Sequence, residues 1–143
     1  MLQNSDLKAF PQTHHEVDAP SYAKDSVCIL GDAAHCMTPW QGSGASQALE
    51  DVMVLDVLLA QVEDAKQIPA AFKAYDAVRR PRTQRIVHSS AETGIIMCGR
   101  GKETGLDVEK IRTLLPGRWD FIYAHDKTEH KREALEAFSK FLE

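Results

Sequence analysis

The sequence has little cysteine, little excess of either charge and no long apolar run. Its three cysteines are an odd number without a CxxC spacing, which predicts reduced thiols rather than a disulfide framework or a zinc site. A net charge of −4 excludes a broad basic surface for nucleic acid or anionic membranes. The longest apolar run, 52–60, is interrupted by Asp56 and is too short to cross a bilayer. The first residues lack the basic and apolar segments of a secretory signal, so we expect a cytoplasmic protein.

The composition is that of one folded domain, with 43% hydrophobic and 27% charged residues in 143 positions. The pattern predicts a mainly α fold with one or two strands. Residues 1–25, broken by Pro11 and Pro20, predict an irregular lead-in with at most a short strand at 7–10. The apolar run at 26–30 is ended by Gly31, which predicts one buried strand.

Apolar residues at helical spacing predict the remaining elements. The first helix covers 43–62, and its inner stripe consists of Ala45, Ala48, Leu49, Val52, Leu55, Leu59 and Val62. Glu50 and Asp51 fall on a more polar side of that helix. A second helix opens at Ile68 and is interrupted at Pro81, and helical pattern resumes over 85–98. Further helices are predicted at 107–115 and 128–143, with an aromatic patch at 119–123 that packs the C-terminal segment onto the body.

The densest signal is residues 31–51, GDAAHCMTPWQGSGASQALED, which join the predicted strand to the first helix. A carboxylate at a strand tip, here Asp32, accepts charge-assisted hydrogen bonds from sugar or polyol hydroxyls. Gly42 and Gly44 let backbone approach a flat ligand closely. The free N–H groups of a helix start stabilise negative charge. This order of residues therefore predicts a ligand site between a strand tip and a helix N-terminus.

The pattern GDAAHxxxPxxGxGxxxAxED resembles the flavin-binding motif of FAD-dependent aromatic-ring hydroxylases, the group A flavoprotein monooxygenases, and is most similar to the salicylate-hydroxylase-like branch. The resemblance covers about residues 16–125 and is sharpest over 26–60. It implies that Asp32 binds the ribityl chain of FAD, and that Pro39 borders the ring near its oxygen-reacting carbon. It also implies that the N–H groups of Ala45 and Ser46 face the N1–C2=O edge. The implied cofactor-binding set is Gly31, Asp32, Ala33, Pro39, Gly42, Gly44, Ala45 and Ser46.

Other residues of the segment carry weaker indications. Trp40 fits two interpretations equally, a lining of the substrate cavity or ordinary packing. A lone histidine such as His35 is more typical of a hydrogen-bonded structural residue than of a base. The basic run predicts a solvated, ion-paired helix face, formed by Arg79, Arg80, Arg82 and Arg85. We predict neither a catalytic acid, base or nucleophile nor a metal site. This is consistent with the resemblance, because in that family the flavin carries the chemistry with NAD(P)H and O₂.

The sequence lacks the GxGxxG fingerprint that holds a dinucleotide pyrophosphate, and one or two strands cannot form a self-sufficient sheet. The family carries that fingerprint, a second Asp-Gly motif and a substrate-binding sheet. The resemblance therefore implies a C-terminal fragment of an α/β, Rossmann-like, two-domain monooxygenase fold. Residues 1–25 form the lead-in, 26–125 the C-terminal part of the FAD-binding domain, and 126–143 a C-terminal helix.

The implied function is hydroxylation of a small aromatic or phenolic substrate, with FAD as cofactor and NAD(P)H as co-substrate. We expect the isolated chain to be inactive, because the pyrophosphate and substrate segments are absent. An unpartnered strand edge predicts self-association. Two alternatives remain. One is a flavoprotein of the same fold with other chemistry, such as an isoprenoid reductase. The other is a truncated, non-catalytic helical interaction fragment.

Overall fold

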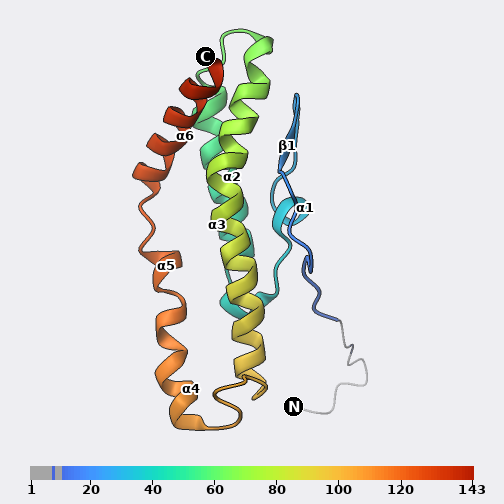
Figure 1. Ribbon diagram of the computed structural model, residues 1–143, viewed down its shortest axis with the longest axis vertical. Helices are drawn as coiled ribbons and strands as arrows, with labels where there is room; N and C mark the ends of the chain where they lie inside the picture. Colours follow the sequence, from blue (N-terminus) through green and yellow to red (C-terminus); the bar gives the residue numbers. More distant parts are fainter. Residues whose placement is uncertain (1–7, 9–10) are drawn as a thin grey trace.

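The computed structural model describes residue 8 and residues 11–143. The short strand predicted at 7–10 lies almost entirely outside these described residues. Two small strands come first, then helices that are joined by short loops (Figure 1). In chain order the elements are β1 (Ala23–Lys24), β2 (Val27–Cys28), α1 (Asp32–His35), η1 (Pro39–Gln41), α2 (Gly44–Leu59), η2 (Ala65–Gln67), α3 (Ile68–Met97), α4 (Val108–Leu114), η3 (Pro116–Arg118), α5 (Asp120–Tyr123) and α6 (Lys127–Leu142).

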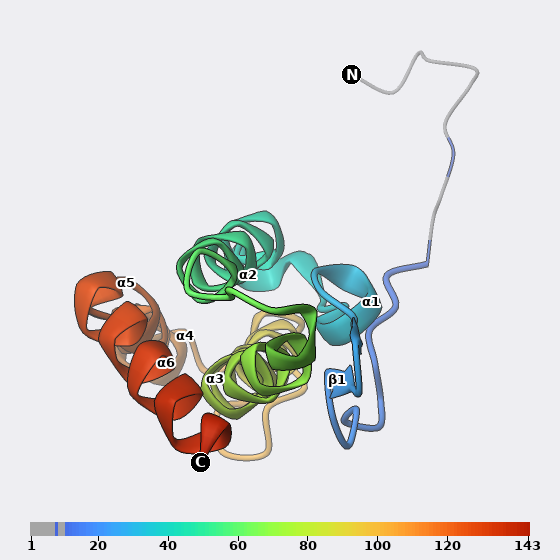
Figure 2. The ribbon, with the colours of Figure 1, turned by 90° about the horizontal axis from the view of Figure 1, so that it is seen from above.

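Three helices, α2, α3 and α6, pack against one another, and α1 with the β1–β2 hairpin lies on the side of α3 away from α6 (Figure 2). The core between these helices is built largely from small and branched residues, which lets the backbones approach closely. Its buried apolar members include Val54, Leu58, Ala71, Ala74, Tyr75, Ala134 and Phe138. Burial of one Leu or Phe side chain contributes about 1.5–3 kcal/mol, so this cluster is the main source of stability in the helical body. None of the helices within the described residues has the length and apolar character needed to cross a membrane.

Helix α3 is continuous, so the interruption predicted at Pro81 is wrong. A proline removes one backbone donor from the helix and crowds the preceding turn. Here Pro81 lies on the exposed side, while its neighbours Arg79 and Thr83 are fully buried. The Thr83 hydroxyl also donates to the carbonyl of Arg79 at 3.1 Å. Tertiary packing on both sides of the proline therefore holds the helix together. The predicted helix end before Gly99 and the predicted helices at 107–115 and 128–143 are confirmed within one or two residues.

The buried strand predicted at 26–30 is only partly confirmed. Two residues, Val27 and Cys28, pair antiparallel with Lys24 and Ala23, and the chain beyond them is not a strand. Val27 is 68% exposed and Leu30 is 39% exposed. A strand of parallel type is buried only when it has neighbours on both sides. The sheet described in this chain consists of β1 and β2 alone, so these apolar residues face solvent.

Helix α2 carries its polar residues inward. Glu50 and Asp51, predicted on the polar side, are buried together with Gln47, Val54 and Leu58. Leu49 and Val52, predicted in the inner stripe, are 71% and 54% exposed. The apolar period is real, but it marks a second face of the helix. Leu49, Val52 and Leu59 on that face are exposed, whereas Leu55 and Val62 pack against the core. The carboxylates of Glu50 and Asp51 face an arginine of α3.

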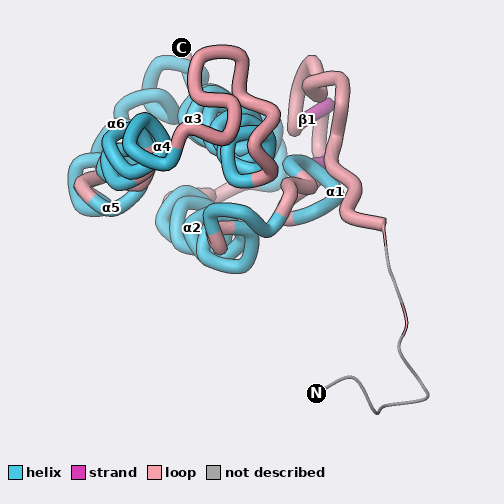
Figure 3. The backbone as a smooth tube through the Cα atoms, turned by 90° about the horizontal axis from the view of Figure 1, so that it is seen from below, coloured by secondary structure: helices cyan, strands magenta, loops and turns pink. Residues whose placement is uncertain are grey.

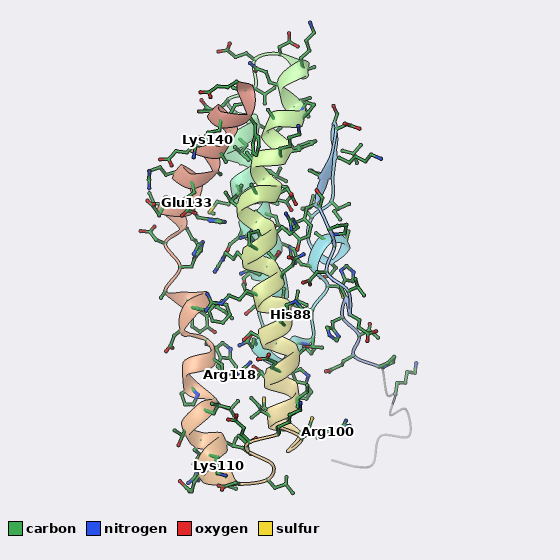
Figure 4. The ribbon with its side chains drawn as sticks, viewed as in Figure 1. His88, Arg100, Lys110, Arg118, Glu133 and Lys140 are labelled. Atoms are coloured by element: carbon green, nitrogen blue, oxygen red, sulfur yellow. The ribbon has the colours of Figure 1, made fainter. Side chains whose placement is uncertain are left out.

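The predicted packing of the aromatic patch is confirmed for two of its rings. The indole Nε1 of Trp119 donates to the carbonyl of Gln41 at 3.2 Å. The guanidinium of Arg85 lies 4.1 Å from the ring centre of Phe121. Arg118, from η3, also reaches back to α3, where its Nε donates to the Thr93 hydroxyl at 2.7 Å (Figure 4). The three cysteines are free thiols, as predicted.

Candidate functional site

The turn from β2 into α1 is made by Gly31, which has a φ of +57°. Residues with a side chain rarely adopt this backbone conformation, so glycine suits the position. The Gly31 carbonyl accepts the N–H groups of Ala34 and His35, each at 2.9 Å, and this starts α1. Asp32 is the first residue of that helix and is exposed. Within the described part of the chain, no hydrogen bond or ion pair engages its carboxylate. Asp32 is therefore available to a ligand.

The start of α2 provides unused donors. Ser43 stands at the N-cap, but its hydroxyl donates to the carbonyl of Gln41 at 3.1 Å and accepts nothing from the helix. The first backbone bond into the helix is from Gln47 N–H to the Ser43 carbonyl, at 3.0 Å. Among the described residues, none accepts the N–H groups of positions 44–46. A helix of 16 residues thus begins with free N–H groups and the positive end of its dipole.

The structure brings the two halves of the predicted set together. Helix α1 packs beside α2 (Figure 3), with the Cα of Gly31 facing Ala48. Gly31 is buried, Gly44 is half-buried, and the rest of the set is exposed. A Cβ added to Gly42 would meet no atom within 4 Å. The predicted residues therefore border an open face, although their contacts with a cofactor stay a prediction.

Trp40 takes a packing role in this chain. It is half-buried, and its indole lies directly against Gly94 of α3. This contact supports the packing interpretation of Trp40. Its neighbour Pro39 is exposed at the start of η1.

Asp51 of α2 is the site residue that sequence reasoning missed. It is fully buried, and its Oδ2 accepts the Gly31 N–H at 2.9 Å and the His35 Nε2 at 2.7 Å. Its Oδ1 accepts the Nε of Arg79 at 2.8 Å. Burial by itself would raise the pKa of Asp51, but the bonds from His35, Arg79 and Gly31 outweigh it and lower the pKa. The prediction that His35 is a hydrogen-bonded structural residue is confirmed.

Arg79 is not part of a solvated face. Its side chain is fully buried, which corrects the prediction for this residue. Its Nη1 donates to Glu50 Oε2 at 2.9 Å, and its Nη2 donates to both the carbonyl and Oε1 of Gln47, each at 3.0 Å. Arg82 is 9% exposed and donates to both oxygens of Glu50, so it too lies inside the fold. The prediction is correct for Arg80, whose partly exposed side chain pairs with Asp76. Arg85 is exposed as predicted, but its guanidinium lies over the ring of Phe121, and no acidic partner is found for it among the described residues.

Glu50 is held ionised by these two arginines. Burial favours its neutral form, but the bonds from Arg82 and the charge of Arg79 lower its pKa to about 2. The signal for this network was present in the sequence, as an acidic pair on one predicted helix and an arginine on the next. The apolar period instead predicts this acidic pair on the surface, because it marks the opposite side of α2 as the inner one.

Comparison with known proteins identifies the fold to which this site belongs. The family model described as "FAD binding domain" matches residues 5–90. The chain belongs to the FAD binding domain family. Its relatives include 6-methylsalicylate 1-monooxygenase of Aspergillus terreus, 36% identical over 125 residues, with 87% of this chain and 28% of the relative covered. A salicylate hydroxylase of Pseudomonas putida is 37% identical over 122 residues, with 85% of this chain and 28% of the relative covered.

A solved structure leads to the same group. The structure titled "Salicylate hydroxylase substrate complex" superposes with a TM-score of 0.78 and 37% identity, over 81% of this chain and 28% of that chain. The chain therefore spans a little over a quarter of the length of these relatives. The small sheet and exposed apolar residues of this FAD binding domain segment agree with part of a larger FAD-binding fold.

Proposed function

We propose that this segment holds the ribityl chain and the N1–C2=O edge of FAD in a monooxygenase that hydroxylates an aromatic or phenolic substrate with NAD(P)H and O₂. The observation that carries the proposal is the combination of the Asp32 carboxylate with three N–H groups at the start of α2, all without a hydrogen-bond partner among residue 8 and residues 11–143. The family assignment supplies the cofactor, and the geometry supplies the places where it would be held.

The residues present fit an isoalloxazine ring and its sugar-like chain. A carboxylate accepts hydroxyl donors from the ribityl chain in charge-assisted bonds. The free N–H groups at Ala45 and Ser46, with the helix dipole behind them, favour the negative charge that reduced flavin carries at N1–C2=O. The open space at Gly42, where a Cβ would meet no atom within 4 Å, would let the ring approach the backbone. The flavin supplies electron transfer and oxygen chemistry, while this segment supplies position and electrostatics.

The substrate class rests on the relatives. Their printed names concern salicylate and 6-methylsalicylate, which are small aromatic acids. We therefore propose a phenolic acid as substrate for the enzyme that carries this segment. No residue of the segment is proposed as a catalytic acid or base.

The test is FAD retention by a complete enzyme that carries this segment. Asp32→Ala removes a charge-assisted bond worth about 1.5–3 kcal/mol, so we expect FAD to bind about tenfold or more weakly. Asp56→Ala is the matched control, because Asp56 is an exposed carboxylate on α2. Flavin fluorescence gives both dissociation constants, and NAD(P)H consumption with salicylate tests the substrate class. Equal dissociation constants for Asp32→Ala and the parent would contradict the proposal that Asp32 binds FAD.

A further inference from the structure

Asp51 connects the Gly31–His35 turn to the helical body through one buried carboxylate. Its Oδ2 accepts from Gly31 and His35, which flank Asp32 in the chain, at 2.9 Å and 2.7 Å. Its Oδ1 accepts from Arg79 of α3 at 2.8 Å. We propose that Asp51, fixed by Arg79, is a positioning residue for FAD, acting through the Gly31–His35 turn that presents Asp32. This inference rests on the function proposed above for Asp32.

The turn needs to be held by Asp51, because no hydrogen bond within the described residues orients the Asp32 carboxylate itself. Its carboxylate makes no hydrogen bond within the described part of the chain, so its orientation depends on the backbone on either side. Gly31 has a positive φ of +57°, and its N–H is held by Asp51. The imidazole of His35, 1% exposed, is held by the same oxygen. One carboxylate oxygen therefore fixes both ends of the four-residue α1.

Arg79 in turn prevents that carboxylate from rotating. Its guanidinium is buried, and all three of its nitrogens donate to acceptors of α2, including both the Gln47 carbonyl and side chain. An arginine fork fixes the direction of several acceptors at once, which a lysine ammonium cannot do. The position of α3 relative to α2 therefore affects the geometry of the Gly31–His35 turn.

Glu50 provides an internal control. It is the adjacent residue of α2, it is 6% exposed, and it also accepts from Arg79. Its remaining bonds are to Arg82 and Gln47. None of its hydrogen bonds reaches the Gly31–His35 turn in the described structure. Both Glu50 and Asp51 therefore contribute to stability, whereas only Asp51 can also position Asp32 through the turn.

The experiment compares Asp51→Asn with Glu50→Gln in the complete enzyme that carries this segment. Each variant removes one buried negative charge from the same arginine. We expect the two variants to lower the thermal midpoint of the apoprotein similarly, and only Asp51→Asn to weaken FAD binding, by about tenfold. His35→Ala, which removes the Nε2 donor to Asp51, should also weaken FAD binding, and His35→Gln, which keeps a donor at the Nε2 position, should restore it. In the background of Asp32→Ala, Asp51→Asn should have little further effect on FAD affinity.

The outcomes separate this inference from the proposed function. If Asp32→Ala leaves FAD affinity unchanged, the proposed function fails, and the positioning role fails with it. If Asp32→Ala weakens FAD but Asp51→Asn weakens it no more than Glu50→Gln does, the proposed function stands and the positioning role is overturned. A full additive loss in the double variant would overturn action through Asp32. If Asp51→Asn does not fold, the two His35 variants decide the matter in the same way.

Discussion

The indole of Trp40 packs against Gly94 of α3, where a Cβ would overlap the indole nitrogen and two of its carbons. Gly94 itself is buried in the last turn of α3, and glycine within a helix costs up to about 1 kcal/mol relative to alanine. Close contact with the ring explains why a glycine stands there. The contact ties η1, and with it Pro39, to the body of the fold.

Gly94→Ala is expected to destabilise the chain despite its better helix propensity. Overpacking costs about 1–3 kcal/mol, which exceeds the propensity gain. Chemical denaturation measures the change, and the emission of Trp40 should shift as its ring moves. Gly117→Ala is the control, since its nearest contact would be an ordinary 3.7 Å from Asp120. A Gly94→Ala chain as stable as the parent would contradict the packing interpretation, and Trp40→Phe should partly rescue the variant.

Stability should fall on mild acidification through buried His130 and its half-buried neighbour His125. His130 is 2% exposed, its ring lies 4.5 Å from that of His125, and its Nε2 is 3.4 Å from Arg79 Nη1. Its other ring nitrogen lies 3.3 Å from Glu133 of α6 (Figure 4). Burial lowers the pKa of His130, and the charge of Arg79 lowers it further. Burial and the charge of Arg82 lower the pKa of His125.

A lowered histidine pKa means that the unfolded chain binds protons more readily than the folded one. The free energy of unfolding should therefore be constant well above pH 6.5 and decrease as the pH falls below it. The carboxylates affect stability only at lower pH. Because the pKa of Glu50 is lowered to about 2, its contribution to the free energy of unfolding is lost only as the pH falls below about 4.5. Denaturant midpoints at pH 7 and 5 check this. His130→Gln should flatten the slope, while His88→Gln, a change at an exposed histidine, should leave it intact.

The motif that carries the candidate site is local, and this is why the sequence could predict it. The glycine at a positive φ, the exposed carboxylate and the helix start lie within fifteen residues of one another, so their spacing alone specifies the turn. The Asp51–Arg79 pair could not be predicted in this way. Its members are 28 residues apart, and only the packing of α2 on α3 brings them together. The continuity of α3 through Pro81 has the same cause, since tertiary contacts outweigh a local helix breaker.

The isolated chain should bind FAD only weakly. Asp32 and the α2 start would hold the ribityl chain and the ring, but the sequence has no GxGxxG loop for the pyrophosphate. Titration of the purified chain with FAD, followed by flavin fluorescence, measures this. Riboflavin is the matched ligand, because it lacks the ADP half, and we expect it to bind about as well as FAD. Stoichiometric binding of FAD at micromolar concentration would contradict the expectation.

The isolated chain should also self-associate through the second face of α2. Leu49 is 71%, Val52 54% and Leu59 43% exposed, and their spacing puts all three on one side of the helix. Val27, on the short hairpin, is 68% exposed. Apolar surface of this kind normally has a partner, and the only sheet among the described residues is the short β1–β2 pair. Sedimentation velocity should show species larger than a monomer of 15.9 kDa.

Leu49→Lys with Val52→Lys should shift the chain towards monomer, whereas Glu63→Lys, at an exposed site beyond the C-terminal end of α2, should not. A parent chain that is monomeric at every concentration and unfolds in one sharp, high-temperature transition would mean that its core is complete without a partner.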